Sequence, residues 1–263
     1  MNSEYLHKVE LKGTAETVSS QCIRFLHIPK TAGSTRGLIF RKQFGKRATF
    51  CFSGDIKGDV IRFQSFSDRR KDQIVFFHGH APLFTGLLKA DSARAFTMLR
   101  DPIERLKSFF QHVYEGKSPY IDDTFLGKTF NLDRFLDSQN PELSNLQAKM
   151  LINSHSCESA DIIDSISPSQ AVDMALDGLL NKLCGYGLQE FFDESLSRLS
   201  KILDFRLTTY VSKNKKNAKK LVQFEDKHIE KIMMLNTIDI ELYRVAKENF
   251  VSRINQFSKR HSV

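Results

Sequence analysis

The sequence predicts an α/β protein with a central, mainly parallel sheet flanked by helices and a helix-rich C-terminal half. Two observations support this class. Short β-favouring apolar segments alternate with longer helical patterns, as expected for parallel strands covered on both faces. The 263 residues are 41% hydrophobic and contain neither an internal repeat nor a Pro/Gly-rich linker. We therefore expect one domain over residues 21–263, after a loose polar arm over residues 1–20.

The expected strands are short, apolar and rich in β-favouring residues. They cover residues 22–28, 49–52, 73–77, 95–99 and 182–188. The pattern of residues 55–70 is ambiguous.

The expected helices begin after polar capping residues. Ser34 or Thr35 can cap a helix that ends near residue 44, and Asp101 with Pro102 provides an N-cap and a first helical residue for a helix to about residue 114. Further helices are expected near residues 131–137, 141–153, 168–180, 190–203, 218–235 and 239–256.

The chain is basic, with a formal net charge of +8. Such a balance predicts an anionic partner, and nucleic acid, a membrane surface, a polyanionic glycan and nucleotide phosphates all remain open. The four cysteines at positions 22, 51, 157 and 184 lie far apart without metal-ligand spacing, so we expect mostly buried, reduced thiols and no metal site. The N-terminal residues lack a signal-peptide pattern and no stretch has membrane-spanning length, so we expect a cytoplasmic protein without a transmembrane segment.

The stretch FLHIPKTAGSTRGLIF (25–40) passes from an apolar strand through a loop of small residues into a helix. Such a loop directs backbone N–H groups and a helix N-terminus at one point, which favours anion binding, and Lys30 adds a full charge. An ordinary strand-to-helix turn with a solvated lysine remains the alternative. The loop does not match the Walker A pattern, because its lysine precedes the glycine.

The segment HIPKTAGST resembles the 5′-phosphosulfate loop of sulfotransferases that use 3′-phosphoadenosine 5′-phosphosulfate (PAPS). The form is similar to that of the family that includes heparan sulfate 2-O-sulfotransferase and bacterial relatives. The resemblance implies that the donor is held by Lys30, Thr31, Ala32, Gly33, Ser34 and Thr35. It further implies that Lys30 stabilises or protonates the bridging oxygen of the leaving phosphate.

The segment FTMLRDPIERLKSFFQHVYEG resembles the 3′-phosphate segment of the same family. Arg100 ends a strand and Ser108 follows eight residues later, as that pattern requires. A guanidinium clamps a phosphate through two hydrogen bonds, and a hydroxyl on the next helix adds a donor. The alternative is that Arg100 pairs with a carboxylate while Ser108 faces solvent.

The segment FFHGHAPL places His78 and His80 at the expected C-terminal end of a strand, where open α/β sheets bind ligands. This strand is expected to run parallel to the one near Ile28, so that the histidines lie beside the phosphosulfate loop. The pair resembles the His-Gly-His of the heparan enzyme, in which a histidine serves as base. The resemblance leaves open which of the two acts here, and the other is expected to be structural.

The resemblance covers residues 22–250 and implies a three-layer P-loop-like fold. The implied reaction moves a sulfuryl group from PAPS to a hydroxyl of a carbohydrate or other hydroxylated acceptor and releases 3′-phosphoadenosine 5′-phosphate (PAP), without a metal. We expect a glycan or glycolipid acceptor and no nucleic acid. Heparan itself is not expected, because the sequence shows no membrane anchor or disulfide pattern.

Two alternatives come from other classes of protein. One is a P-loop-like nucleotide kinase or NTPase, and the other is a basic polyanion-binding protein. Two further features are open to either interpretation. The neighbourhood of Gln147 either reaches the active site or only packs a helix, and the Lys-rich segment 212–220 is either a lid or a solvated loop.

Overall fold

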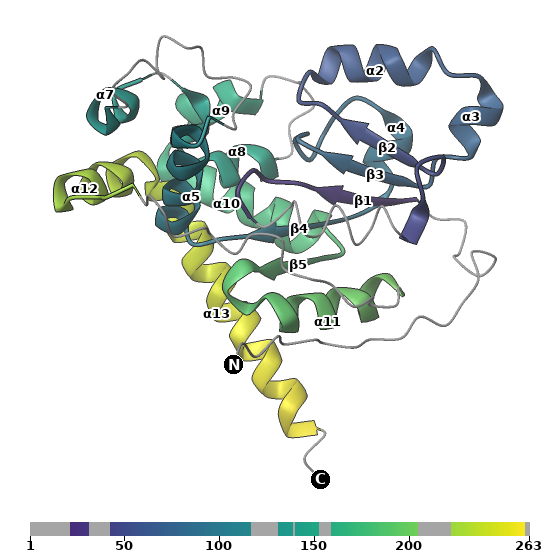
Figure 1. Cartoon of the computed structure of the whole chain (residues 1–263). Coiled ribbons are helices and arrows are strands. Elements are labelled where there is room, and N and C mark those ends of the chain that lie inside the picture. Colours follow the sequence, from purple (N-terminus) through teal and green to yellow (C-terminus); the bar gives the residue numbers. More distant parts are fainter. Residues whose placement is uncertain are drawn as a thin grey trace, which may run out of the picture.

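The computed structural model describes residues 22–31, 43–116, 131–138, 140–152, 159–204 and 222–260. A five-stranded parallel sheet with the order β2-β3-β1-β4-β5 lies at its centre (Figure 1). The strands are β1 (Ile23–Leu26), β2 (Thr49–Phe52), β3 (Phe76–Gly79), β4 (Arg94–Leu99) and β5 (Gly185–Leu188). The predicted α/β class with a parallel sheet is confirmed.

The third strand differs from its predicted bounds. It begins at Phe76 and continues through His78 and Gly79, which the sequence pattern predicts as a turn. Gly79 pairs with Leu26 and Phe52 on the neighbouring strands and has a φ of 126°. A Cβ atom at this position would lie 2.2 Å from the Phe52 carbonyl oxygen, so this crowded backbone requires glycine.

Helices make up most of the remaining described chain. The α-helices up to about residue 150 are α2 (Ile56–Gln64), α3 (Asp68–Asp72), α4 (Leu88–Asp91), α5 (Pro102–Tyr114), α7 (Leu132–Leu136) and α8 (Leu146–Leu151). They are followed by α9 (Ser159–Ser165), α10 (Pro168–Asp177), α11 (Phe192–Leu203), α12 (Asp226–Leu235) and α13 (Thr237–Arg260). Short turns of 3-10 or π helix form η1 (Pro141–Leu143), η2 (Gly178–Lys182) and η3 (Gln189–Phe191).

Helices cover both faces of the sheet, as the three-layer prediction requires (Figure 1). On one face, Phe25 and Phe96 pack with Leu199 of α11. On the opposite face, Leu26 and Leu99 pack with residues of α8, α10 and α13. Successive residues of a strand point to opposite faces, so each strand contributes to two hydrophobic cores.

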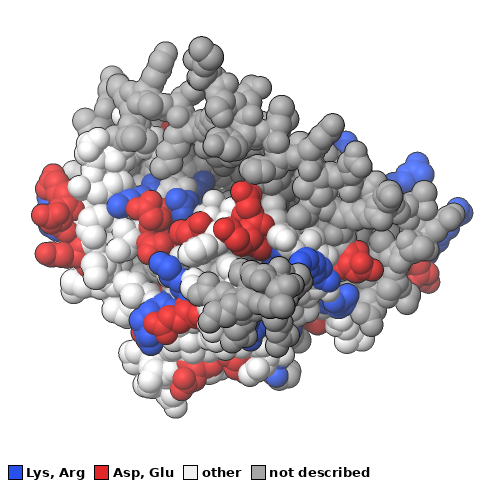
Figure 2. Space-filling model, turned by 90° about the horizontal axis from the view of Figure 1, so that it is seen from below, with Lys and Arg blue, Asp and Glu red and all other residues white. Residues whose placement is uncertain are grey.

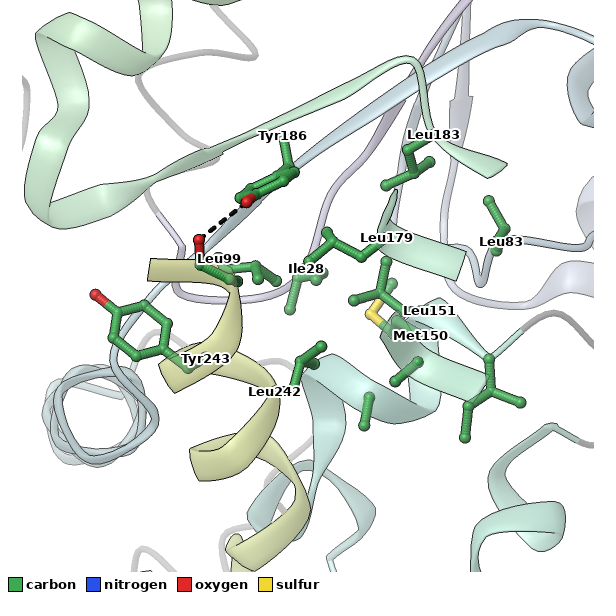
Figure 3. Packing of buried hydrophobic residues seen from close by; sticks show 14 of the residues in the cluster. Ile28, Leu83, Leu99, Met150, Leu151, Leu179, Leu183, Tyr186, Leu242 and Tyr243 are labelled. Carbon is green, nitrogen blue, oxygen red and sulfur yellow. Dashed lines mark hydrogen bonds between the residues drawn. The ribbon is translucent and has the colours of Figure 1, made fainter. Parts of the chain in front are cut away.

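The core that contains α13 is important for the site because it fixes this long helix against the sheet. Figure 3 shows Ile28, Leu99 and Leu242 converging in this core. The Tyr186 hydroxyl of β5 donates a hydrogen bond of 2.9 Å to the Ala246 carbonyl of α13 (Figure 3). A buried aromatic side chain with a satisfied hydroxyl stabilises the contact at both its apolar and its polar end.

Several helices differ from their predicted bounds. The helix predicted over 141–153 divides into η1 and α8 around Asn145, which has a left-handed backbone with φ 46°. The side chain of Asn145 accepts hydrogen bonds from the Ile238 and Asp239 N–H groups, so a tertiary contact causes the break. The ambiguous segment 55–70 contains α2 and the start of α3, and α12 begins later than predicted, at Asp226.

The cysteine prediction is wrong on burial for the described residues. Cys51 is exposed, Cys22 and Cys184 are half-buried, and all three are reduced. Burial raises the pKa of Cys22 and Cys184. Cys157 and the predicted arm over residues 1–20 lie outside the described residues. Among the helices that the structure describes, none is long and apolar enough to cross a membrane.

Candidate active site

The ends of three neighbouring strands meet at one edge of the sheet. Leu26 of β1 pairs with Gly79 of β3 and with Thr97 of β4. Because all three strands are parallel, the segments that follow them leave the sheet at the same edge, where open α/β sheets bind ligands. The expected parallel arrangement of the strands before Lys30 and His80 is confirmed.

Lys30 lies in the tight turn that follows β1. Its backbone is left-handed, with φ 68°, a conformation that costs a residue with a Cβ atom about 1–2 kcal/mol. The next residue, Thr31, is buried, and its hydroxyl donates a 2.8 Å hydrogen bond to the Ile28 carbonyl. This bond helps to hold the strained turn. The predicted donor-binding residues from Ala32 to Thr35, including the predicted helix cap, lie outside the described residues.

Arg100 follows β4 and contacts the Lys30 turn directly. Its Nη1 donates a 3.2 Å hydrogen bond to the Lys30 carbonyl, and its Nη2 lies 3.9 Å from a carboxylate oxygen of Glu104. Its Nε is buried without a hydrogen-bond partner among the described residues. Burial lowers the pKa of Arg100, and the charges of Glu190 and Glu104 oppose this effect. The guanidinium remains a cation at neutral pH.

Ser108 lies half-buried on α5, one helical turn beyond Glu104. Residues four apart lie on the same face of a helix, so Ser108 lies on the same face of α5 as Glu104, which is close to Arg100. The predicted N-cap of this helix is confirmed, because the Asp101 carboxylate accepts 3.0 Å hydrogen bonds from the N–H groups of Ile103 and Glu104. Asp101 therefore uses its carboxylate to cap the helix.

His80 lies at the surface beside the Lys30 turn. Its Nδ1 is 3.2 Å from the His27 carbonyl oxygen, and the two imidazole rings are 4.4 Å apart at their centroids. A carbonyl only accepts hydrogen bonds, so Nδ1 carries the hydrogen and the neutral ring keeps a lone pair on Nε2. The residue is exposed, but the protein around the ring still removes water from it, and this desolvation lowers the pKa of His80. The hydrogen bond to the His27 carbonyl raises the pKa, and the positive charge of Lys30 lowers it.

His78 occupies a different environment. It is only 4% exposed, stacks on Phe76 with 5.6 Å between ring centroids, and has its Nδ1 3.9 Å from the Cys51 sulfur. His78 and Phe76 are two residues apart on β3 and therefore point to the same side of the sheet. The structure thus separates the two predicted histidines: His80 lies beside the Lys30 turn, and His78 is buried against Phe76.

Two residues that the sequence does not single out, Glu190 and Tyr243, form hydrogen bonds at the end of β4. Glu190 accepts a 3.0 Å hydrogen bond from the Asp101 N–H and a 2.7 Å bond from the Tyr243 hydroxyl. Burial, followed by the bond to Glu190, raises the pKa of Tyr243, so its hydroxyl stays protonated and donates. Glu190 lies 89 residues from Asp101 in the chain, and no local pattern relates them.

Gln147 contacts the same end of the sheet through Arg100. Its side chain is fully buried and makes two hydrogen bonds to the Arg100 backbone. Nearby, burial raises the pKa of Glu142, and the charges of Arg105 and Lys30 lower it. In the part of the chain that the structure describes, no group of three or more His, Cys, Asp or Glu side chains could hold a metal ion.

The fold and the arrangement of this edge define an α/β protein with cationic and imidazole groups gathered at the ends of parallel strands. Comparison with known proteins identifies the family. The model of the sulfotransferase family matches residues 17–245, and the chain belongs to this family. The family predicted from the motifs is therefore confirmed.

Two curated relatives are heparan-sulfate 6-O-sulfotransferases. The chain is 25% identical over 179 residues to heparan-sulfate 6-O-sulfotransferase 3-B of Danio rerio, which covers 60% of this chain and 42% of the relative. It is 23% identical over 179 residues to heparan-sulfate 6-O-sulfotransferase 2 of Gallus gallus, which covers 60% of this chain and 44% of the relative. The matched region thus spans less than half the length of each relative.

A solved structure also resembles the chain. Mouse sulfotransferase SULT7A1 complexed with PAP matches with a TM-score of 0.39 and 12% identity, over 82% of this chain and 63% of that chain.

Proposed function

We propose that this protein is a PAPS-dependent O-sulfotransferase that transfers a sulfuryl group to a hydroxyl of a carbohydrate acceptor and releases PAP. The observation that carries the proposal is the convergence of Lys30, Arg100 and His80 at one sheet edge in a member of the sulfotransferase family. Arg100 bonds to the carbonyl of Lys30, and the charge of Lys30 acts on the pKa of His80. Membership of this family favours sulfuryl transfer over the kinase alternative.

The described residues fit a donor that carries a 3′-phosphate. Arg100 commits Nη1 to the Lys30 carbonyl, whereas its Nε is a buried donor without a partner in the described chain. A cation with unused donors at a strand end is suited to bind a phosphate. Ser108, on the same side of α5 as Glu104, is the proposed second donor to this group.

His80 is the proposed base. Its Nδ1 hydrogen is used by the His27 carbonyl, which leaves the Nε2 lone pair to take the acceptor proton. Its lowered pKa favours the neutral form that a base requires. His78 is proposed to be structural, because it is 4% exposed and stacks on Phe76.

The proposed reaction balances without a further reactant. PAPS supplies an activated sulfuryl group, whose bond to the bridging phosphate oxygen breaks while the acceptor oxygen bonds to sulfur. The products are a sulfate ester, PAP and one proton. His80 takes that proton at Nε2, Arg100 binds the 3′-phosphate, and the Lys30 ammonium stabilises the negative charge on the departing oxygen.

The acceptor class and location are part of the same proposal. The names of the two relatives support a glycan acceptor, and we retain a glycan or glycolipid hydroxyl. In the described part of the face drawn in Figure 2, Lys and Arg side chains lie among Asp and Glu side chains and do not form a single basic patch. We propose a cytoplasmic location, which cell fractionation tests directly.

Ligand-dependent unfolding tests the donor assignment. We expect PAP to raise the melting temperature much more than adenosine 5′-phosphate (AMP), which lacks only the 3′-phosphate, or ATP. At a hundredfold excess over its Kd, a ligand stabilises the folded state by about 2.7 kcal/mol. Equal shifts with PAP and ATP would overturn the proposal, and release of PAP from PAPS in the presence of a glycan acceptor would complete its support.

A further inference from the structure

We propose that Gln147 is a positioning residue that places Arg100 for recognition of the donor 3′-phosphate. This inference rests on the proposed function. The observation behind it is a pair of hydrogen bonds from one side-chain amide to both polar groups of the Arg100 backbone. Gln147 Oε1 accepts from the Arg100 N–H at 3.0 Å, and Gln147 Nε2 donates to the Arg100 carbonyl at 2.9 Å.

These two bonds lie just beyond the end of the sheet. The pairing of β4 with β5 ends at Leu99, paired with Leu188, so the Arg100 backbone lies one residue past the ladder. The Gln147 amide offers one acceptor and one donor in the way that a neighbouring strand does. It thereby extends the rigidity of β4 by one residue, to the residue that carries the guanidinium.

Gln147 is itself held from a second direction. Asp239, fully buried on α13, accepts hydrogen bonds from the backbone N–H groups of Gln147 at 3.0 Å and Ala148 at 2.8 Å. The Asn145 side chain in turn accepts from the N–H groups of Ile238 and Asp239 at 3.1 and 3.2 Å. The starts of α8 and α13 therefore cap each other, and this contact fixes the backbone that carries the Gln147 side chain.

The consequence for binding follows from the geometry of guanidinium recognition. Two parallel N–H···O bonds to a phosphate depend on the position and plane of the guanidinium. Displacement of reacting or binding groups by about 1 Å costs large factors in well-organised sites. The hydrogen bond from Arg100 Nη1 to the Lys30 carbonyl restricts the guanidinium further.

A purely structural role for Gln147 predicts a different result from a positioning role. Loss of structure weakens every ligand and lowers stability. Loss of Arg100 placement weakens ligands that carry a 3′-phosphate and leaves AMP largely unaffected. The ratio of PAP affinity to AMP affinity therefore separates the two roles, because these ligands differ only in that phosphate.

The first variant is Gln147→Met, which keeps the side-chain length and removes both hydrogen bonds. We expect PAP affinity, measured by calorimetry, to fall about tenfold, equivalent to about 1.4 kcal/mol, and AMP affinity to change less than about twofold. The matched control is Gln170→Met on α10, which removes another amide that accepts a 3.0 Å bond from a backbone N–H, that of Ser167. The control should retain both affinities.

The second variant is Gln147→Glu, which keeps the shape of the side chain and tests the hydrogen bond that Gln147 donates to the Arg100 carbonyl. An ionised carboxylate cannot donate to the Arg100 carbonyl, whereas a protonated carboxyl group can. Burial favours the protonated form, so its PAP affinity relative to the wild type at the same pH should rise as the pH falls. The same ratio for Gln147→Met should stay constant with pH, because methionine does not titrate.

A double variant tests whether Gln147 acts through Arg100. If it does, Arg100→Ala with Gln147→Met should bind PAP no more weakly than Arg100→Ala alone. A wild-type protein that fails to bind PAP overturns the proposed function. If the wild type binds PAP, three results overturn only the positioning role. In Gln147→Met, these are equal losses of affinity for PAP and AMP, or an unchanged affinity for PAP. In the double variant, it is a loss of PAP affinity equal to the sum of the two single losses. If Gln147→Met does not fold, the pH response of Gln147→Glu decides the question.

Discussion

The assignment of the base to His80 rather than His78 leads to a prediction with both a magnitude and a pH signature. In His80→Ala, the Nε2 lone pair disappears together with the bond to the His27 carbonyl, which is 3.2 Å long. Lys30 and Arg100, the groups proposed to bind the donor, remain bonded to each other through the Lys30 carbonyl. We therefore expect PAP binding to persist while sulfuryl transfer is lost.

The size of the effect follows from the protonation state of the ring. General base catalysis contributes about 10²–10⁴-fold, or about 3–5 kcal/mol of activation free energy. Burial lowers the pKa of His80, which favours the neutral ring at neutral pH. A base works only when neutral, so activity is present above this pKa and falls about tenfold per pH unit below it.

The assay is PAPS turnover with saturating acceptor between about pH 5 and 8. The activity of the wild type should fall at acidic pH, and this acidic limb should have a midpoint lower than that of an unperturbed imidazole because burial lowers the pKa of His80. His80→Ala should be slow at all pH values and lack this limb. The contrasting variant is His78→Phe, which preserves a ring stacked on Phe76 and should retain most activity and the same limb.

Full activity in a folded His80→Ala protein would refute the assignment of the base. Loss of the acidic limb in His78→Phe with a normal limb in His80→Ala would transfer the role to His78. If both variants kept the wild-type profile, Glu142 would be the next group to test, because its carboxyl is electrostatically coupled to Lys30. Each variant must first bind PAP like the wild type.

Three further predictions concern the rest of the site. Lys30→Ala should lower turnover about 100-fold or more while PAP binding is largely retained, because the ammonium acts on charge that develops in the transition state; near-normal turnover would contradict this role. Asp239→Ala should lower the free energy of unfolding in urea by about 2–5 kcal/mol, because it leaves the buried N–H groups of Gln147 and Ala148 without their acceptor; a loss below about 1 kcal/mol would show that other groups replace it. EDTA should leave turnover unchanged, and restoration of an EDTA-sensitive activity by magnesium would favour the kinase alternative.

The sequence alone determined the fold class and the edge of the sheet at which the candidate site lies. Strand periodicity and the helix cap at Asp101 are local properties, so they can be identified without knowledge of distant contacts. The same holds for the placement of Lys30, His80 and Arg100 after strands. Parallel strands bring their C-terminal ends to one edge, which made the meeting of these segments predictable.

Only the tertiary structure distinguished the two histidines. In sequence, His78 and His80 are equivalent, because each is a histidine beside the same glycine. The difference arises because the sheet register extends β3 to Gly79, which buries His78 against Phe76 and places His80 beside the His27 carbonyl. Register is a property of the paired strands and is not encoded in the spacing of two residues.

The supporting contacts around Arg100 likewise depend on folding. Gln147 lies 47 residues from Arg100, and Glu190 lies 89 residues from Asp101, yet each side chain bonds to the backbone at the end of β4. The break at Asn145, which orients Gln147, depends on N–H groups of α13 that lie 93 and 94 positions away. Sequence patterns report the hydrogen bonds that a segment makes with itself, whereas these backbone groups find their partners only when α8 and α13 pack together against the sheet.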